Sequence, residues 1–171
     1  MIKTIHHWKN IALVEETIIY PNGQTLVHTT IKHPGAAVIL PITTDKRVIV
    51  IRQFRPSLKK WLLELPAGTI ENNETALECA QRELEEETGY SGEQFFELGQ
   101  VTPMAGFCDE IQYLFVAKQL TKTQRFQCDD DELIEVLSLT IEELEQYIID
   151  GDISDAKTIA CLSKAKLCGY L

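Results

Sequence analysis

The first fifth of the chain has a β-type pattern of apolar and polar residues. Residues 11–20 are rich in β-branched side chains, and residues 24–32 alternate apolar and polar positions. A Pro-Asn-Gly turn signal separates them, so the two segments are predicted to form a β-hairpin. A His-Pro-Gly break follows at 33–35. We therefore expect residues 1–35 to form an N-terminal β extension and residues 36–171 to form the main domain.

The main domain mixes strand and helix patterns. Short apolar runs between polar turns predict strands over 36–42, 47–54, 61–65, 94–101, 111–117 and 133–139. Apolar residues that recur every three or four positions predict helices over 74–88 and 141–149, and from Ser154 or Asp155 to about Cys168. Because strands and helices do not alternate strictly, we expect an α/β (α+β) fold in which helices cover a mixed sheet.

The predicted helices carry recognisable end signals. Asn72 or Asn73 can cap the start of helix 74–88, and Gly89 follows its end. Thr140 and Glu143 have capping-box spacing before the second helix. On a helical wheel one sector of helix 74–88 is expected to face the core, and it holds Ala76, Leu77, Ala80 and Leu84.

Composition narrows the class of protein. The 171 residues are 44% hydrophobic and 25% charged, which excludes a wholly disordered chain, and the net charge of −10 argues against a nucleic-acid binder. No apolar run is long enough to cross a membrane, and the N-terminus lacks the apolar region of a signal peptide. The five cysteines are scattered without metal-binding spacing, which is typical of reduced thiols in the cytoplasm.

Three glutamates gather near the end of helix 74–88. Glu83 and Glu87 are four residues apart and lie on one side of the helix, and Glu86 lies beside Glu83. These carboxylates repel one another, and Arg82 offsets only part of that repulsion. Two interpretations remain open: a solvated acidic face, or a site for a hard cation such as Mg²⁺ or Mn²⁺.

The residues around this trio form a longer motif. Gly68, Glu74 and the run Arg82-Glu83-Leu84-Glu85-Glu86-Glu87-Thr88-Gly89-Tyr90 have the spacing G-x5-E-x7-R-E-U-x-E-E-x-G-U, where U is an apolar residue. The chain therefore resembles the Nudix hydrolase family over nearly its whole length. The resemblance implies an α/β/α sandwich with a mixed central sheet and an enzyme that depends on Mg²⁺, with Mn²⁺ as an alternative.

The resemblance also implies roles for the motif residues. The implied metal ligands are Glu83, Glu86, Glu87 and the carbonyl of Ala67. Glu86 and Arg82 are implied catalytic residues, and Arg82 and Glu74 would also orient the ligands. Gly68 permits the loop to approach the helix closely. Glu64 either faces the metal or is a strand glutamate turned to water.

Segments outside the motif resemble the ADP-ribose pyrophosphatase branch of the family; these are residues 50–56, 64–68, 102–110 and 155–158. By this resemblance Arg55 binds the diphosphate, since a guanidinium forms forked, permanently charged hydrogen bonds. Arg52 is the neighbouring candidate, but alternate strand positions face opposite ways, so only one is expected to serve. Glu110, with Asp109 as second choice, is the implied carboxylate on a mobile loop that helps to activate water or binds a metal.

The same branch implies a role for the extension. Its strands would build a homodimer, and Trp8 and His28 are candidates for contact with adenine, although Trp8 fits a dimer core equally well. The predicted function is Mg²⁺-dependent hydrolysis of ADP-ribose, or a related nucleoside diphosphate sugar, to AMP and ribose 5-phosphate. The alternatives are hydrolysis of GDP-mannose or a dinucleoside polyphosphate, and a non-catalytic module that senses a nucleotide sugar.

Overall fold

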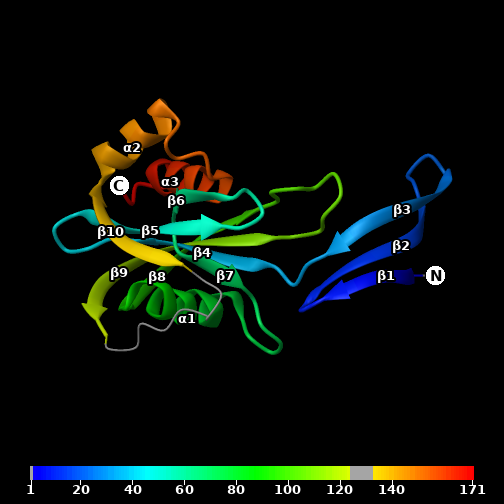
Figure 1. The fold of residues 1–171 in the computed structure, drawn as a ribbon, viewed down its shortest axis with the longest axis horizontal. Helices are drawn as coiled ribbons and strands as arrows, with labels where there is room; N and C mark the ends of the chain where they lie inside the picture. Colours follow the sequence, from blue (N-terminus) through cyan, green and yellow to red (C-terminus); the bar gives the residue numbers. More distant parts are fainter. Residues whose placement is uncertain (1, 124–132) are drawn as a thin grey trace.

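The computed structural model describes residues 2–123 and 133–171. Its elements are, in order, β1 (Ile2–Trp8), β2 (Ile11–Ile19), β3 (Thr25–Lys32), β4 (Ala36–Pro41), β5 (Arg47–Arg55), β6 (Lys60–Glu64), β7 (Ala67–Thr69), α1 (Ala76–Thr88), β8 (Tyr90–Val101), β9 (Gln112–Lys122), β10 (Ile134–Thr140), α2 (Ile141–Asp150) and α3 (Ala156–Leu167). Figure 1 shows a main body with a narrow β extension reaching away from it.

The extension is an antiparallel sheet of β1, β2 and β3. The predicted hairpin is confirmed, since β2 pairs with β3 around the turn at residues 20–24. Strand β1 was not predicted because polar residues interrupt its apolar positions and every residue in it is exposed. Pairing with β2, rather than burial, holds it in place.

The main body contains two sheets instead of the single sheet that was expected. One has the order β7-β4-β9-β8 and is mixed, because β4 and β9 run parallel while the other pairs are antiparallel. The second has the order β10-β5-β6 and is antiparallel. The predicted mixed α/β architecture is confirmed, although the strands split into two groups.

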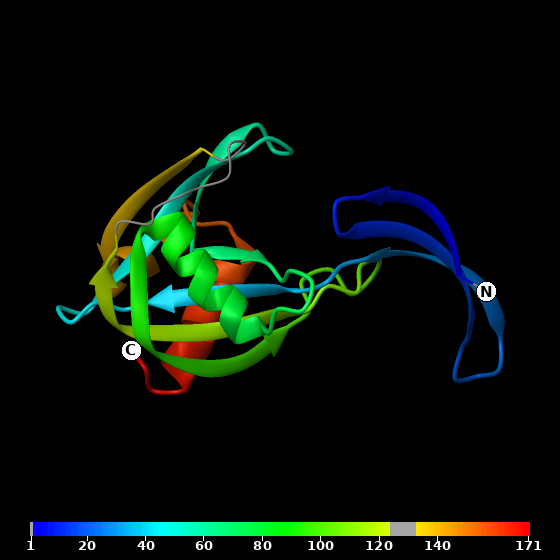
Figure 2. The ribbon, with the colours of Figure 1, turned by 90° about the horizontal axis from the view of Figure 1, so that it is seen from below.

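Helices cover both sides of the mixed sheet (Figure 2). Alternate residues of β4 point to opposite faces, as the strand period requires. Ala37 and Ile39 pack in one cluster with Leu84 of α1, whereas Val38 and Leu40 belong to another that contains residues of α2 and α3. In the described ranges, no helix has the length and apolar character needed to span a membrane.

The start and core face of α1 differ from the prediction. Thr75, not Asn72 or Asn73, is the N-cap: its hydroxyl accepts from the Glu78 backbone N–H, and the Glu78 carboxylate accepts from the Thr75 N–H. Asn73 has a φ of 67°, so it belongs to the preceding turn.

The buried face of α1 also differs from the predicted sector. Leu77 is 43% exposed, so its assignment to the core was wrong, and Cys79 is fully buried instead. The predicted end at Gly89, with a φ of 69°, and the capping box of Thr140 and Glu143 are confirmed.

Candidate active site

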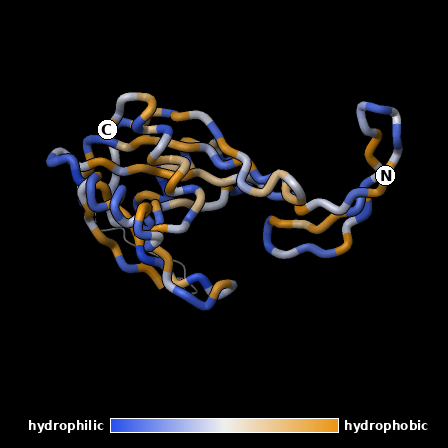
Figure 3. The backbone as a smooth tube through the Cα atoms, turned by 90° about the horizontal axis from the view of Figure 1, so that it is seen from above, coloured by the Kyte–Doolittle hydropathy of each residue, from blue (hydrophilic) through white to orange (hydrophobic). Residues whose placement is uncertain are grey.

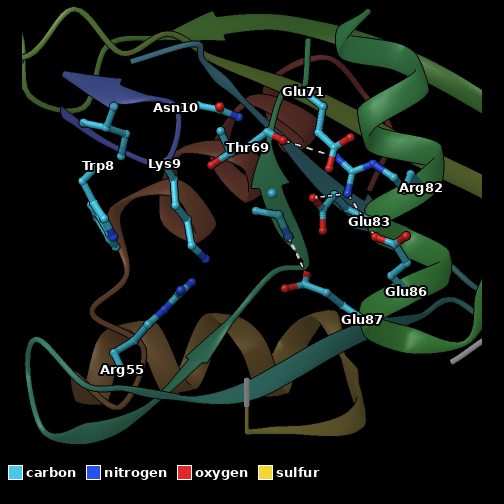
Figure 4. Close-up of a pocket in the computed structure, with 13 residues that line it drawn as sticks. Trp8, Lys9, Asn10, Arg55, Thr69, Glu71, Arg82, Glu83, Glu86 and Glu87 are labelled. Atoms are coloured by element: carbon cyan, nitrogen blue, oxygen red, sulfur yellow. Dashed lines mark hydrogen bonds and ion pairs between the residues drawn. The ribbon is translucent and has the colours of Figure 1, made fainter. Parts of the chain in front are cut away.

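A cavity of about 490 Å³ lies between the extension and the main body. We call it the main cavity (Figure 4). One wall carries the glutamates of α1, and the floor is formed by β7. The β1–β2 turn closes the opposite side with Trp8, Lys9 and Asn10, and Arg55 reaches in from the end of β5. The site therefore combines an acidic wall with two cationic side chains across from it.

Arg82 organises the acidic wall. Its Nε and Nη2 donate to the two carboxylate oxygens of Glu74 at 2.8 and 3.0 Å. Its Nη1 donates to Glu83 at 2.6 Å and to Glu86 at 3.0 Å. The hydrogen bond with Glu74 raises the pKa of Arg82 above its ordinary value and holds the pKa of Glu74 below its own. One guanidinium thus reduces the mutual repulsion of the glutamates and fixes their orientation.

The loop that faces α1 fits closely around its carboxylates. The Ala67 backbone N–H donates to Glu87 at 2.9 Å, and Glu87 is 3% exposed. A Cβ on Gly68 would lie 1.7 Å from Oε1 of Glu83, which no side chain can do. A side chain at position 68 would therefore have to displace the Glu83 carboxylate, and Gly68 allows β7 to lie directly against it.

This donor set fits a hard divalent cation. Carboxylate oxygens gathered on one wall are the ligands that Mg²⁺ and Mn²⁺ prefer, and the Ala67 backbone lines the same cavity. Because Gly68 has no Cβ, β7 lies directly against the Glu83 carboxylate. Within residues 2–123 and 133–171, no three acidic, His or Cys side chains already converge at metal-binding distance. Arg82 holds Glu83 and Glu86 there, so ligation would exchange some of its contacts.

Arg55 is anchored from behind the main cavity. Its Nε and Nη2 donate to the two oxygens of Glu64 at 2.9 and 2.6 Å, and Glu64 is fully buried. Of the two readings of Glu64, exposure to water is therefore wrong for this structure, because its carboxylate lies between Arg55 and Lys157. Burial alone would raise the pKa of Glu64, but these two cations more than offset that effect and lower it.

The other arginine points elsewhere. Arg52 pairs with Glu135 at 2.9 Å and lies over the ring of Trp61, 4.8 Å from its centroid. It is not among the residues that line the main cavity. The expectation that the two arginines face opposite ways is met, and Arg55 is the one at the site.

The remaining candidate site residues line two different cavities. Trp8 is 62% exposed and lines the main cavity. His28, Asp109 and Glu110 line a shallower cavity of about 380 Å³ between β3 and loop 102–111, which we call the loop cavity. Glu110 is 9% exposed and accepts from Nε2 of Gln112 at 3.0 Å. The structure thus does not bring Glu110 or His28 together with the α1 glutamates.

A NUDIX domain family model matches residues 32–160. The chain belongs to the NUDIX family. The match covers the main body and leaves most of the extension outside. The prediction of a Nudix hydrolase from the spacing of the motif is confirmed. Nudix hydrolases generally use divalent metal ions, in agreement with the donor set described above.

Similar proteins come from bacteria. The Nudix chain is 38% identical over 158 residues to "Methanol dehydrogenase activator" of Bacillus methanolicus, covering 92% of this chain and 85% of the relative. It is 34% identical over 160 residues to "ADP-ribose pyrophosphatase" of Bacillus subtilis (strain 168), covering 93% and 86%. A crystal structure of an ADP compounds hydrolase superposes with a TM-score of 0.84 over 99% of this chain and 93% of that one. At 21% identity, this match supports the fold alone.

Sequence reasoning missed several residues of the site. Lys9 and Asn10 line the main cavity, but a two-residue turn between strands gives no signal of its position in space. Lys157 lay inside a segment that resembled the branch, yet no role was assigned to it. Its contact with Glu64, 93 positions earlier, follows only from the docking of α3.

Proposed function

We propose that this Nudix hydrolase cleaves the diphosphate bond of ADP-ribose or a related nucleoside diphosphate sugar, giving AMP and ribose 5-phosphate from ADP-ribose, with Mg²⁺ as cofactor. The observation that carries the proposal is the opposition of the α1 glutamates to Arg55 and Lys9 across one cavity. A diphosphate needs both walls: cationic side chains for its oxygens, and carboxylates that share a divalent ion with it. The relative named ADP-ribose pyrophosphatase supports this substrate class.

Each wall has its own task in this proposal. Glu83, Glu86, Glu87 and the Ala67 carbonyl would hold Mg²⁺, which polarises a phosphorus–oxygen bond and lowers the pKa of bound water. The side chain of Glu86 is 42% exposed, which favours it over the enclosed Glu87 as the group that accepts a proton from the attacking water. Arg55 orients the diphosphate through the guanidinium edge that Glu64 does not use.

The extension supplies the wall for the base and a surface for a second copy of the chain. We assign residues 1–35 to this extension and 36–171 to the Nudix domain. Trp8 is the aromatic side chain at the cavity and would stack on adenine. Figure 3 shows hydrophobic segments, in orange, along the extension. Several large apolar residues there are each at least 47% exposed: Ile2, Ile5, Ile19, Leu26 and Val27. Apolar exposure of this kind supports a homodimer.

A hydrolysis assay tests the chemistry. ADP-ribose, GDP-mannose and a diadenosine polyphosphate are incubated with the protein and Mg²⁺, then with a chelator. We expect chelator-sensitive release of AMP from ADP-ribose at the highest kcat/KM. The double variant Glu86→Gln/Glu87→Gln should lose turnover by orders of magnitude, whereas Glu85→Gln, a matched change on the same helix outside the cavity lining, should not. Near-normal turnover in the folded double variant would overturn the proposal.

The assembly is tested separately. Light scattering coupled to size exclusion should give the mass of a dimer for the full chain. Ile19→Lys, at a residue 74% exposed and outside the main cavity, should shift that mass towards the monomer. A wild-type chain that is monomeric at micromolar concentration contradicts the dimer. We place the protein in the cytoplasm, where its buried free thiols Cys79, Cys108 and Cys161 would stay reduced.

The 38% identical relative favours a second candidate function. The name of that relative describes activation of methanol dehydrogenase, and in this second function the chain would act on such an enzyme through the same site. Purified methanol dehydrogenase is assayed with the wild-type chain and with the double glutamine variant. Stimulation by both proteins supports a binding module, whereas stimulation by the wild type alone ties the effect to hydrolysis.

A further inference from the structure

A chain of charged side chains runs from α3 to the main cavity. Glu64, at the end of β6, is fully buried, and its carboxylate contacts both Arg55 from β5 and Lys157 from α3. The side chain of Lys157 is only 11% exposed. Arg55 lines the main cavity, whereas Glu64 and Lys157 lie behind it. The three residues connect the cavity to a helix that carries none of the Nudix motif.

The carboxylate of Glu64 determines where the Arg55 guanidinium points. Both of its oxygens are used, in two parallel hydrogen bonds of 2.9 and 2.6 Å. Such a forked pair fixes the plane of the guanidinium as well as its distance. An unanchored arginine would sample many rotamers, and binding a substrate would freeze them at a cost in conformational entropy. The pair removes most of that loss beforehand.

The first turn of α3 in turn fixes Glu64. Lys157 contacts the same carboxylate oxygen that accepts from Nη2 of Arg55, and it also donates to Asp155 at 3.1 Å. Next to it, the Thr158 hydroxyl accepts from the Leu65 backbone N–H at 2.8 Å. The Asp155 side chain caps α3 by accepting from the Thr158 N–H at 3.0 Å. This turn therefore holds both the Glu64 side chain and the backbone beside it.

We propose that Lys157 is a positioning residue for diphosphate binding: through Glu64 it sets the orientation of Arg55 in the main cavity. The inference rests on the proposed function, in which Arg55 binds the diphosphate. A lone cation opposite a fully buried carboxylate would draw that carboxylate to itself. With Lys157 bound to the same carboxylate, Glu64 stays at the end of β6 and holds Arg55 at the cavity wall.

The kinetic test compares Lys157→Met with Lys166→Met, a change of the same kind on the same helix at a residue paired on the surface with Glu145. With ADP-ribose, Lys157→Met should raise KM about tenfold and leave kcat within about twofold, because the lost interaction binds ground state and transition state alike. Lys166→Met should change neither constant, and Lys157→Arg should recover most of the loss. An unchanged KM in folded Lys157→Met would overturn the proposal.

Lys157→Met leaves Glu64 paired with one cation only, which can weaken the fold. The same substitution is therefore also made in a variant that lacks the charged pair. Arg55→Met/Glu64→Gln removes the charged pair together. If Lys157 acts through Glu64 and Arg55, adding Lys157→Met to this background should change KM by less than about twofold. A further tenfold rise there would instead show direct contact between Lys157 and the substrate.

An NMR readout separates this proposal from the proposed function. The Nε–H resonance of Arg55, identified by its absence in Arg55→Met, should be sharp and slow to exchange in the wild type. In Lys157→Met it should broaden or exchange faster, and in Lys166→Met it should not. If the wild type hydrolyses no nucleotide sugar but this signal responds, the positioning stands and the substrate class fails. If hydrolysis occurs and the signal is unchanged, the positioning fails alone.

Discussion

Replacing Gly68 by alanine tests the geometry of the acidic wall most directly. The three atoms nearest to the added methyl group are Oε1, Cδ and Cγ of Glu83, at 1.7, 1.8 and 2.5 Å. All three distances are shorter than any real Cβ contact, so either the Glu83 side chain or strand β7 must move. Because the obstacle is a side chain, we expect Glu83 to swing away and lose its 2.6 Å bond with Arg82.

The expected loss of stability is moderate. Inserting a methyl group into a filled space destabilises a fold by about 1–3 kcal/mol. For a chain of this size each kcal/mol lowers Tm by about 2–4 °C, so Gly68→Ala should lower Tm by about 2–12 °C. Activity should fall further, by about 100-fold or more in kcat/KM, since displacing even an outer partner of a metal site costs 10–100-fold.

A double-mutant cycle decides whether this reasoning is right. Tm and kcat/KM for ADP-ribose are measured for Gly68→Ala, Glu83→Ala and the double variant. Once Glu83 is truncated, the added methyl group meets no carboxylate, so Gly68→Ala should then lower Tm by less than about 2 °C. Gly106→Ala, where a Cβ would meet no atom within 4 Å, is the control and should behave as the wild type. An equal loss in both backgrounds would refute the steric explanation.

Three further predictions follow from the described contacts. Thr75→Ala removes the cap of α1 and should lower the unfolding free energy by about 1 kcal/mol in thermal or denaturant unfolding, with KM unchanged. The hydrogen bond from Arg82 holds the pKa of Glu74 below its ordinary value of 4.5, so that pair stabilises the fold above this pH and ceases to as pH falls through the lowered pKa. The unfolding free energy of the wild type should therefore drop more steeply below pH 4.5 than that of Glu74→Gln, and parallel curves would contradict this. Burial raises the pKa of the Cys79 thiol to about 12, so iodoacetamide at pH 8 should alkylate the exposed Cys168 long before Cys79, as peptide mass spectrometry can measure.

Local rules were enough to predict the acidic wall. The spacing of Glu83, Glu86 and Glu87 on a helix places them on one side whatever the rest of the fold does. Arg82 lies on the same helix, and the short loop that leads from β7 into α1 brings Gly68 close to these glutamates. The strands of the main body were likewise found because short apolar runs, such as the fully buried β4, stand between polar turns.

Long-range packing decided what could not be predicted. The Leu77 error arose because a wheel gives the direction of a side chain but not the width of the buried sector, and α1 buries Cys79 instead. Glu64 has the same sequence environment whether it is exposed or clamped, and only the docking of α3 settles which. Sequence also placed Glu110 on a loop without showing that the loop would pack against the extension.

That packing has a consequence for how this protein can change during evolution. The backbone of loop 102–111 is tied to β3, since the Ile31 N–H donates to Phe107 at 2.8 Å and the Asp109 N–H donates to Ile31 at 3.1 Å. An inserted residue would put these bonds out of register, so the length of this loop is constrained. The Lys9–Asn10 turn borders the main cavity yet only joins two strands, and it can lengthen without disturbing the core. New substrate preferences should therefore arise more readily by insertion at this turn than in the loop.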